Sequence, residues 1–297
     1  MSNLLYNILK DRATFSIHGE DTKTFLQNLI SNDINKVNAN NSIYTCLLTP
    51  QGKYFCDFFV MLFNDTIILD CSYARREEII SKLNIYKLRS SVQIQDLTDQ
   101  YTVFSLHGDD LLSELALSDI PGYSKSFMNG YVYVDPRTTL MGARTVLPTN
   151  TAIQFFKDWG FKPSSDPYDH LRIQNNIPEG DKDLIPGKSF PLEYGFDLLN
   201  AIDFNKGCYI GQELTSRTKH RGSIRKKIIR VKSDTSIPEL GNDIYIGENK
   251  VGIICSSYSN IGLALIRTED YEQNASSGNK MIIRDQDNIA VLTVIGT

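Results

Sequence analysis

The chain has 297 residues, of which 41% are hydrophobic and 22% are charged, and its formal net charge is −4. This composition excludes wholesale disorder, and the length predicts about two domains. The negative net charge disfavours nucleic acid as a partner of the whole chain, so any anion site has to be a local patch.

Neither a secreted nor a membrane protein is expected. The N-terminal segment lacks the pattern of a signal peptide, and no apolar run is long enough to cross a bilayer. We therefore expect no membrane association and a cytoplasmic location. The cysteines are few, widely spaced and without a CxxC pair: Cys46, Cys56, Cys71, Cys208 and Cys255. This spacing disfavours a disulfide framework and a metal site built from cysteines of this chain alone.

Helices alternate with hairpins of strands from residue 13 to about residue 160. After a strand at 13–19, Asp21 is expected to cap a helix whose apolar face holds Phe25, Leu26 and Leu29. The later strands are expected near 43–49, 53–63, 66–71, 91–95, 101–108 and 130–137, and the later helices near 73–87, 109–117 and 151–160. This alternation predicts an α+β fold rather than a doubly wound parallel sheet.

The second half of the chain has less helical pattern. Residues 163–191 are rich in Pro, Gly and Asp and predict a long functional loop. A basic stretch at 217–232 leads into a linker, and the short strands of 239–297 predict a small all-β domain. The predicted domains are therefore 1–232, with a ferredoxin-like part at about 45–120, and 239–297.

The stretch 205–217, NKGCYIGQELTSR, has the composition of a site. Gly207 and Gly211 flank Cys208 and allow a ligand to approach closely. A cation such as Lys206 favours thiolate over thiol, and Gln212 offers an amide to a ligand. Cys208 can thus act in chemistry or bind metal, but a buried cysteine at a tight turn would give the same pattern.

KGCYIGQE resembles the signature of the YgfZ-like folate-binding family of iron–sulfur cluster assembly and repair proteins. This family is similar to the aminomethyltransferase (T-protein) of the glycine cleavage system. Further blocks of the family are matched in order by FSIHGEDTKTFLQNLISNDI, YTCLLTPQGKYFCDFFV, YKLRSSVQIQD, LRIQNNIPEG, FPLEYGF, SRTKHRG and GLALIR, from about residue 13 to 267. The resemblance implies a T-protein-like fold of interleaved α+β parts around a central channel that binds tetrahydrofolate, plus a small C-terminal β-barrel.

The resemblance also implies residue roles. Asp57 stands where T-proteins have an acid/base carboxylate, and Cys208 is implied as a reactive thiolate that ligates a cluster transiently with partner thiolates. The implied cofactor-binding residues are Lys206, Tyr209, Gln212, Glu193, Arg172, Gln174, Arg217 and Arg221. T-proteins have an Asp pair at the Asp57 block and a glutamate at Gln174, so these two departures argue against aminomethyl transfer.

Several of these residues keep a second interpretation. Glu193 either lines the channel or lies on a surface loop, and Tyr44 and Tyr54 either stack on a pterin or pack in the core. The basic run at 217–227 is either an anion patch or a solvated face. His220 is a possible partner of Cys208 in a nucleophilic pair. The other cysteines lie in apolar strand runs and are expected to pack in the core: Cys46, Cys56, Cys71 and Cys255.

The first functional hypothesis is a tetrahydrofolate-binding accessory factor that assembles or repairs iron–sulfur clusters, mainly four-iron ones, in client proteins, a role that extends to tRNA modification. The cluster would be shared transiently with an assembly or client protein. The alternative is a folate-dependent one-carbon (aminomethyl) transferase that uses Asp57. A third hypothesis is a binding module in which Arg217 and Arg221 dock an acidic partner.

Overall fold

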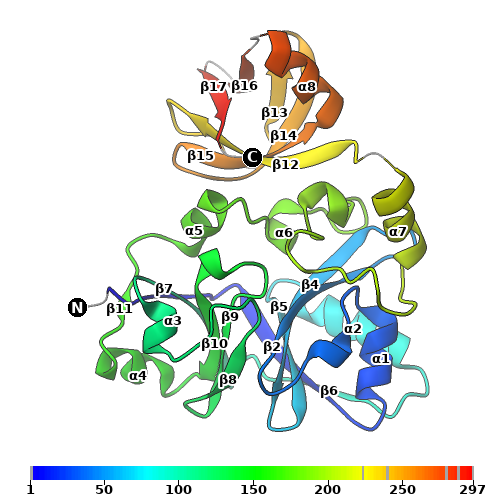
Figure 1. The fold of residues 1–297 in the computed structure, drawn as a ribbon, viewed down its shortest axis with the longest axis vertical. Coiled ribbons are helices and arrows are strands. Elements are labelled where there is room, and N and C mark those ends of the chain that lie inside the picture. The colour runs from blue at the N-terminus through cyan, green and yellow to red at the C-terminus, as the bar shows by residue number, and fades with distance from the viewer. Residues whose placement is uncertain (1–2, 223, 239–240, 278–279, 286–287, 296–297) are drawn as a thin grey trace. The chain divides into compact units, whose positions relative to one another are not determined.

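The computed structural model describes residues 3–222, 224–238, 241–277, 280–285 and 288–295 (Figure 1). The chain divides into two compact units. The first unit contains residues 1–168 and 197–212, and the second contains residues 169–196 and 213–297. The chain thus passes between the units three times, at 168/169, 196/197 and 212/213.

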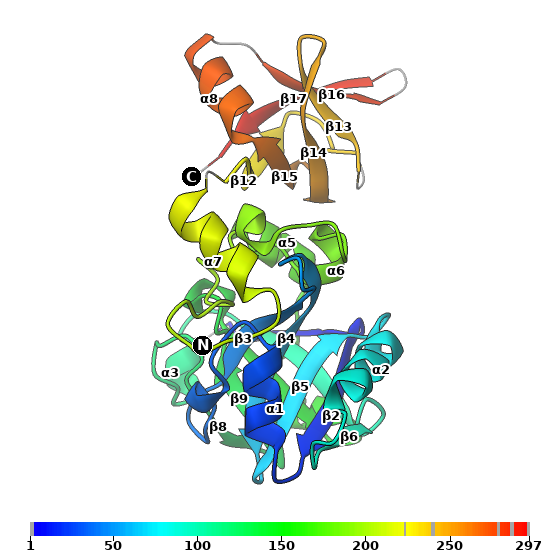
Figure 2. The same ribbon diagram turned by 90° about the vertical axis from the view of Figure 1, so that its right-hand side faces the viewer.

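The first unit contains an antiparallel five-stranded sheet covered on one face by two helices (Figures 1 and 2). Phe25 and Leu29 on the first helix and Ile79 on the second share a buried core with Phe15 and Phe58 of the sheet. In sheet order the strands are β3 (Ile43–Leu48), β4 (Tyr54–Phe63), β5 (Thr66–Ser72), β2 (Arg12–His18) and β6 (Gln93–Asp96), and the helices are α1 (Thr22–Leu29) and α2 (Arg76–Lys87).

The second sheet of this unit has six strands and its own helical cover. Phe155 and Phe156 of the larger helix pack with Phe104 and Val132 of the sheet. In sheet order the strands are β11 (Lys162–Pro163), β1 (Leu5–Ile8), β7 (Tyr101–His107), β10 (Ala143–Pro148), β9 (Gly130–Val134) and β8 (Ser124–Phe127). The helices are α3 (Leu111–Glu114) and α4 (Ala152–Asp158), and short 3-10 turns occur at η1 (Ile34–Lys36) and η2 (Thr139–Met141).

The two sheets face each other through the sides that their helices leave uncovered. Successive side chains of a strand point to opposite faces, so Phe58 faces the helices while Asp57 and Phe59 face the other sheet. The ring centroids of Phe59 and Tyr133 are 6.3 Å apart, and Arg144 of β10 forms an ion pair with Asp70 of β5 at 2.8 Å. The first unit is therefore a four-layer sandwich of helices, sheet, sheet and helices.

The second unit contains a closed six-stranded barrel and several short helices (Figure 1). Around the barrel the strands are β12 (Lys226–Ser233), β15 (Ile261–Arg267), β14 (Asn249–Tyr258), β13 (Asp243–Ile246), β16 (Met281–Asp285) and β17 (Asn288–Val294). The helices are α5 (Tyr168–Gln174), α6 (Gly180–Asp183), α7 (Gln212–Arg221) and α8 (Thr268–Ser277), and η3 (Pro191–Tyr194) is a 3-10 turn.

The predicted α+β class with a C-terminal β-barrel is confirmed, but three predicted details differ from the structure. Residues 45–120 are divided between two sheets, because β7 pairs with β1 and β10 rather than with β2 to β6. Residues 163–191 contain α5 and α6 instead of one long loop. The barrel begins with β12 at Lys226, ahead of the predicted residue 239, since basic residues alternate there with the buried Ile228, Ile229 and Val231.

Among the helices formed by the described residues, none is both long enough and apolar enough to cross a bilayer.

Candidate functional site

Cys208 is the exposed cysteine of the chain, and the other four are buried. The prediction that Cys46, Cys56, Cys71 and Cys255 pack in the interior is confirmed. Burial raises the pKa of the Cys46 thiol to about 12, so this thiol stays protonated near neutral pH. Exposure excludes the interpretation of Cys208 as a packing residue and makes it the thiol that a second molecule can reach.

Lys206 anchors the loop that carries Cys208. It is only 8% exposed, and its ammonium donates hydrogen bonds to three backbone carbonyl oxygens, those of Gln27 (2.8 Å), Ile30 (2.6 Å) and Asn32 (2.8 Å). These carbonyls lie at and just after the C-terminal end of α1, where a cation also interacts favourably with the helix dipole. An ammonium has three donors, and all three are used here. Lys206 is thus a structural anchor, which differs from the expected role as a cofactor ligand.

Replacing Lys206 by methionine is expected to lower the free energy of unfolding by about 3 kcal/mol at pH 7, because three carbonyls lose a charged donor. Burial lowers the pKa of Lys206 from 10.5 to about 8. The unfolded chain then binds more protons than the folded chain between these values, so this group adds stability as the pH rises through that window. Urea unfolding of wild type and Lys206→Met at pH 7 and pH 10 measures both effects. If the difference in free energy of unfolding between wild type and Lys206→Met were smaller at pH 10 than at pH 7, the carbonyls would raise the pKa of Lys206 instead.

The two glycines beside Cys208 have different reasons to be there. Gly211 has a φ of +82°, and a Cβ atom built on it would lie 2.5 Å from the carbonyl oxygen of Thr49 and 3.1 Å from the Cα of Gly52. The Cys208 loop therefore packs directly on the turn at Thr49–Gly52 between β3 and β4. Gly207 has neither a left-handed φ nor any atom within 4 Å of a built Cβ.

Alanine substitutions separate these two roles. Gly211→Ala is expected to lower the free energy of unfolding by about 2 kcal/mol or more, because the loop must move off the turn. Gly207→Ala should change it by less than about 0.5 kcal/mol. Urea denaturation of the pair measures both values. Equal stability of the two variants would contradict this packing of the loop on the turn.

Tyr209 and Gln212 follow Cys208 in the same loop. Tyr209 is buried, its ring lies 5.1 Å from Lys206 Nζ, and burial raises the pKa of its hydroxyl. Gln212 is half-buried and begins α7. His220 of α7 belongs to the second unit and Cys208 to the first, and the Cys–His pair that the sequence allows stays an untested hypothesis.

Asp57 lies on the inner face of β4 and is 4% exposed. Its carboxylate accepts hydrogen bonds from the hydroxyls of Tyr54 (2.6 Å) and Tyr44 (3.0 Å). The Tyr44 ring also contacts the Phe59 ring, with centroids 4.9 Å apart. Both tyrosines are therefore buried polar partners of Asp57, whereas the sequence suggested pterin stacking or simple packing.

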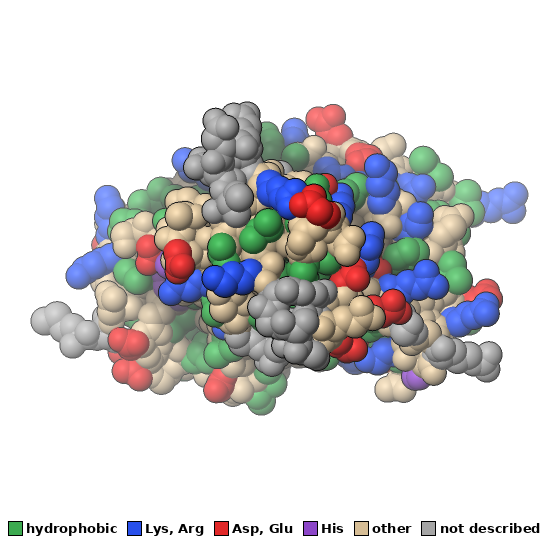
Figure 3. Space-filling view, turned by 90° about the horizontal axis from the view of Figure 1, so that it is seen from above, with side chains coloured by type: hydrophobic (Ala, Val, Ile, Leu, Met, Phe, Trp, Pro, Cys, Tyr) green, Lys and Arg blue, Asp and Glu red, His purple; other side chains and the backbone are tan. Residues whose placement is uncertain are grey.

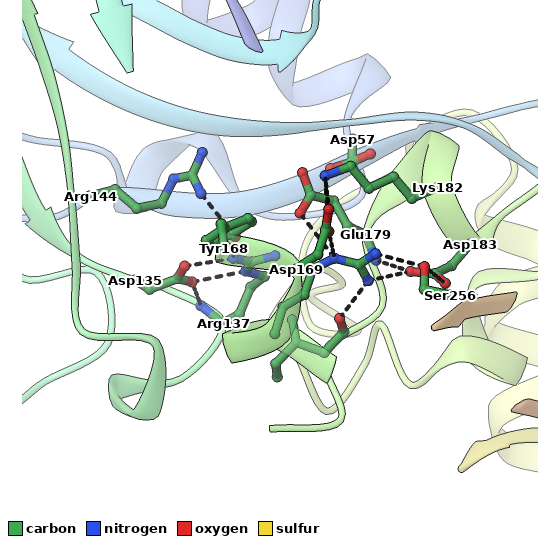
Figure 4. A network of polar contacts seen from close by, with 12 residues as sticks. Asp57, Asp135, Arg137, Arg144, Tyr168, Asp169, Glu179, Lys182, Asp183 and Ser256 are labelled. Atoms are coloured by element: carbon green, nitrogen blue, oxygen red, sulfur yellow. Dashed lines mark hydrogen bonds and ion pairs between the residues drawn. The ribbon is translucent and has the colours of Figure 1, made fainter. Parts of the chain in front are cut away.

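A buried arginine cluster, formed by Arg12, Asp70, Asp135, Arg137, Arg144 and Tyr168, surrounds the same phenylalanine. Figure 4 labels four of its members, Asp135, Arg137, Arg144 and Tyr168. The guanidinium carbon of Arg144 lies 3.9 Å from the centre of the Phe59 ring, and that of Arg137 lies 4.8 Å from it. Asp70 pairs with both Arg12 (2.6 Å) and Arg144 (2.8 Å). Burial lowers the pKa of Arg144, but Tyr168 and Asp70 raise it by more, so the guanidinium stays charged.

Sequence reasoning missed the arginine cluster, although the sequence contains a signal for it. Asp70 and Arg144 are charged residues within otherwise apolar strand runs, TIILDC and ARTVLP. A charge at an inward position of a strand is rarely tolerated unless it is paired. Three guanidinium groups and two carboxylates meet here, and Asp57 adds a third carboxylate on the same sheet face.

Arg172, expected to bind a cofactor, is 1% exposed and is held by residues of the second unit, of which Asp169, Asp183 and Ser256 are labelled in Figure 4. It donates to Asp169 (2.5 Å), Asp183 (2.7 Å) and the hydroxyl of Ser256 (2.6 Å). These partners lie on α5, on α6 and on β14, so Arg172 joins the helices of this unit to its barrel. Such contacts disagree with the expected role of Arg172 as a ligand-binding residue.

The remaining predicted residues of the second unit are more accessible. Gln174 is exposed and contacts His170 Nε2 at 2.8 Å, and Arg217 is exposed on α7. Glu193 is half-buried, and burial raises the pKa of its carboxyl while Lys226 opposes this shift. The side chain of Arg221 lies outside the described part of the structure.

The basic run 217–227 divides between α7 and β12. Four of its cations that the structure describes are exposed besides Arg217: Lys219, Arg225, Lys226 and Lys227. Figure 3 shows one face of the molecule, on which lysine and arginine side chains are interspersed with acidic ones. Both interpretations of the run 217–227, as an anion-binding patch and as a solvated face, are therefore compatible with the structure.

Both the N-terminal part of the chain and its barrel are similar to known protein families. Residues 10–129 match the model described as the GCVT N-terminal domain, and residues 225–292 match the CAF17 C-terminal beta-barrel domain. The protein named "Iron-sulfur cluster assembly factor IBA57 homolog, mitochondrial" of Dictyostelium discoideum is 32% identical over 259 residues, which is 75% of this chain and 61% of that protein. The protein of the same name from Neurospora crassa is 32% identical over 230 residues, 74% of this chain and 52% of that protein.

The chain is homologous to these proteins. It spans between half and two thirds of the length of these two relatives. The crystal structure of glycine cleavage system aminomethyltransferase T from Bartonella henselae is 13% identical, covers 99% of this chain and 85% of its own, and has a TM-score of 0.78. The fold is thus GcvT-like α+β with a closed six-stranded C-terminal barrel, as the sequence predicted.

The expected cytoplasmic location is wrong. It was based on the absence of a leader pattern in the sequence, whereas these homologues are named as mitochondrial proteins.

Proposed function

We propose that this chain is an iron–sulfur cluster assembly factor in mitochondria, and that Cys208 supplies one thiolate to a cluster in transit. The homologues are named as mitochondrial iron–sulfur cluster assembly factors, and these names support both the process and the location proposed here. The observation that carries the role of Cys208 is its exposure on a loop that Lys206 and Gly211 fix from both sides.

The remaining ligands of such a cluster would come from a partner protein. Clusters are held by several thiolates, and one cysteine supplies only one of them. Among the described residues, no group of three or more His, Cys, Asp or Glu side chains is arranged to hold a metal ion. A cluster that this loop shares with an assembly or client protein accommodates both observations.

Cys208→Ser is expected to abolish function without unfolding the protein, because serine is similar in size and the side chain is exposed. Cells that lack the gene would receive wild type, Cys208→Ser or Gly207→Ala, and the activities of four-iron enzymes would be measured in mitochondrial extracts. The serine variant should give the activity of the empty vector, and the alanine control should restore wild-type activity. Full rescue by the serine variant would exclude this role of Cys208.

We further propose that the chain binds tetrahydrofolate, on the basis of the family blocks in the sequence. Arg172 and Lys206 do not fit a ligand role, because contacts within their own units occupy their donors. The accessible groups among the predicted ligands are Gln174, Glu193, Gln212 and Arg217. Calorimetric titration with tetrahydrofolate tests the binding itself.

A folate-dependent one-carbon transferase is the second candidate, and the buried Asp57 with its two tyrosine partners is the observation that favours it. The complementation assay separates the two candidates. A transferase would lose its function in Asp57→Asn and keep it in Cys208→Ser.

A further inference from the structure

The segment that carries Cys208 is irregular. All residues between η3 and α7 are described, and they form turns and bends rather than a helix or strand. The backbone polar groups of such a segment need partners from elsewhere in the fold. The N–H groups of Asp203 and Ile210 donate to the carbonyl oxygens of Ser31 (3.0 Å) and Asn28 (3.3 Å). The position of the thiol therefore depends on residues at and just after the end of α1.

The side chain of Ser31 joins this segment to β3. Ser31 is 0% exposed, and its hydroxyl donates to the carbonyl oxygen of Ala201 at 2.7 Å. The same oxygen accepts the backbone N–H of Cys46, which belongs to β3, at 3.0 Å. A serine hydroxyl has a single proton to donate. In this arrangement that proton is directed to the segment that carries Cys208.

Asn32 makes a second bridge between the same two parts of the chain. Its side-chain nitrogen donates to the carbonyl oxygens of Asn200 (2.7 Å) and Tyr44 (2.9 Å), and Tyr44 lies on β3. Its side-chain oxygen accepts the N–H of Asp33 at 2.7 Å, so the partners fix the orientation of the amide. Asn32 is 4% exposed. Both amide protons are therefore used to hold the Cys208 segment against β3.

These two bridges act together with the anchor at Lys206. The ammonium of Lys206 bonds to the backbone carbonyl of Asn32 at 2.8 Å, so Asn32 holds the segment at two places. Lys36 adds an ion pair with Asp203 at 2.7 Å. Residues at and just after the end of α1 thus fix the backbone before Cys208. A group that binds a metal has to be held within about 0.5 Å of its productive position, and such supporting contacts provide that precision.

We propose that Ser31 and Asn32 are positioning residues for Cys208, whose side chains hold its segment where the thiolate can enter a shared cluster. This inference rests on the proposed function and adds two residues to its site. Both act through the backbone at residues 200 and 201, ahead of the thiol in the chain. Loss of either bridge is expected to loosen this segment while the sheets and the barrel stay folded.

Ser31→Ala and Asn32→Asp each remove one bridge. Asn32→Asp keeps the acceptor oxygen and loses both donors. The matched control is Thr145→Val, which removes another fully buried hydroxyl, one that donates to the carbonyl oxygen of Tyr131 at 2.7 Å in the second sheet. In every folded variant iodoacetamide should modify one cysteine, because unfolding of the whole protein would expose the four buried ones as well.

Amide hydrogen exchange measures the looseness of the segment without reference to its function. In the bridge variants, peptides that cover residues 200–211 should exchange about tenfold faster than in the wild type, as for the loss of a buried hydrogen bond. The same peptides of Thr145→Val should exchange at the wild-type rate. Unchanged exchange in the folded bridge variants would overturn the inference.

The complementation assay then shows whether the position of the segment matters for function. Each bridge variant is expected to lower four-iron enzyme activity about tenfold, as for the loss of supporting contacts at a metal site, and Thr145→Val is not. Full rescue by the bridge variants, or an equal loss in Thr145→Val, would overturn the inference. The proposed function stands in these cases as long as Cys208→Ser fails to rescue, whereas rescue by Cys208→Ser removes the proposed function itself.

Discussion

Asp70→Asn is expected to lower the free energy of unfolding by about 3–5 kcal/mol, one of the two largest effects that we expect from a single substitution. The Asp70 carboxylate is fully buried and pairs with Arg12 at 2.6 Å and with Arg144 at 2.8 Å. Removing one partner of a buried ion pair leaves an uncompensated charge in a medium of low polarity. In this variant Arg12 and Arg144 would both lose the carboxylate with which they pair beside Phe59. Urea unfolding with a fixed m-value measures the loss.

Asp96→Asn is the matched control for this prediction. Asp96 pairs with Arg76 at 3.5 Å, but its side chain is 42% exposed, so the change should cost less than about 1 kcal/mol. Adding Arg144→Met to Asp70→Asn removes one of the stranded cations and should recover part of the lost stability. A loss below about 1 kcal/mol for Asp70→Asn would show that water reaches the arginine cluster.

The strands and helices of the first unit were largely predictable because their apolar side chains follow regular periods. Five elements lie within a few residues of their expected positions: β2, α1, β3, β4 and β5. The predicted N-cap of α1 is a detail that the local sequence pattern does not give correctly. Asp21 does precede the helix, but its side chain accepts the N–H of Ser91 rather than an N–H of α1.

The elements that sequence reasoning missed are those whose residues are stabilised by tertiary partners. β12 begins with the exposed Lys226 and Lys227 and has the half-buried Arg230 and the exposed Lys232 between buried residues, so its sequence indicates a basic stretch rather than a strand. The short α5 and α6 lie in a segment rich in breakers of helices, and the ion pairs of Arg172 with Asp169 and Asp183 hold them together.

The candidate site was predictable as a stretch of sequence but not as a set of roles. The octad KGCYIGQE drew attention to Cys208, whose exposure no local pattern could give. Lys206 looked like a cation beside a thiol, yet its three acceptors come from residues more than 170 positions earlier. Its role as an anchor depends on where α1 ends in space, which sequence spacing does not reveal.

Arg172→Met is expected to lower the free energy of unfolding by about 3–5 kcal/mol. This measurement distinguishes a residue that supports the fold from one that binds a ligand. The guanidinium is 1% exposed and bonds to Asp169, Asp183 and Ser256. Its removal leaves the buried carboxylate of Asp183 without its cation. The second unit should then unfold at lower urea concentration than in the wild type.

Gln174→Ala provides the comparison, since Gln174 follows two residues later on the same helix and is exposed. This control should unfold like the wild type. If Arg172 served a ligand, Arg172→Met would retain wild-type stability and lose affinity for tetrahydrofolate in a calorimetric titration. Every described contact of Arg172 is made within its own unit. We therefore expect Arg172→Met to lower the free energy of unfolding whether or not tetrahydrofolate is present.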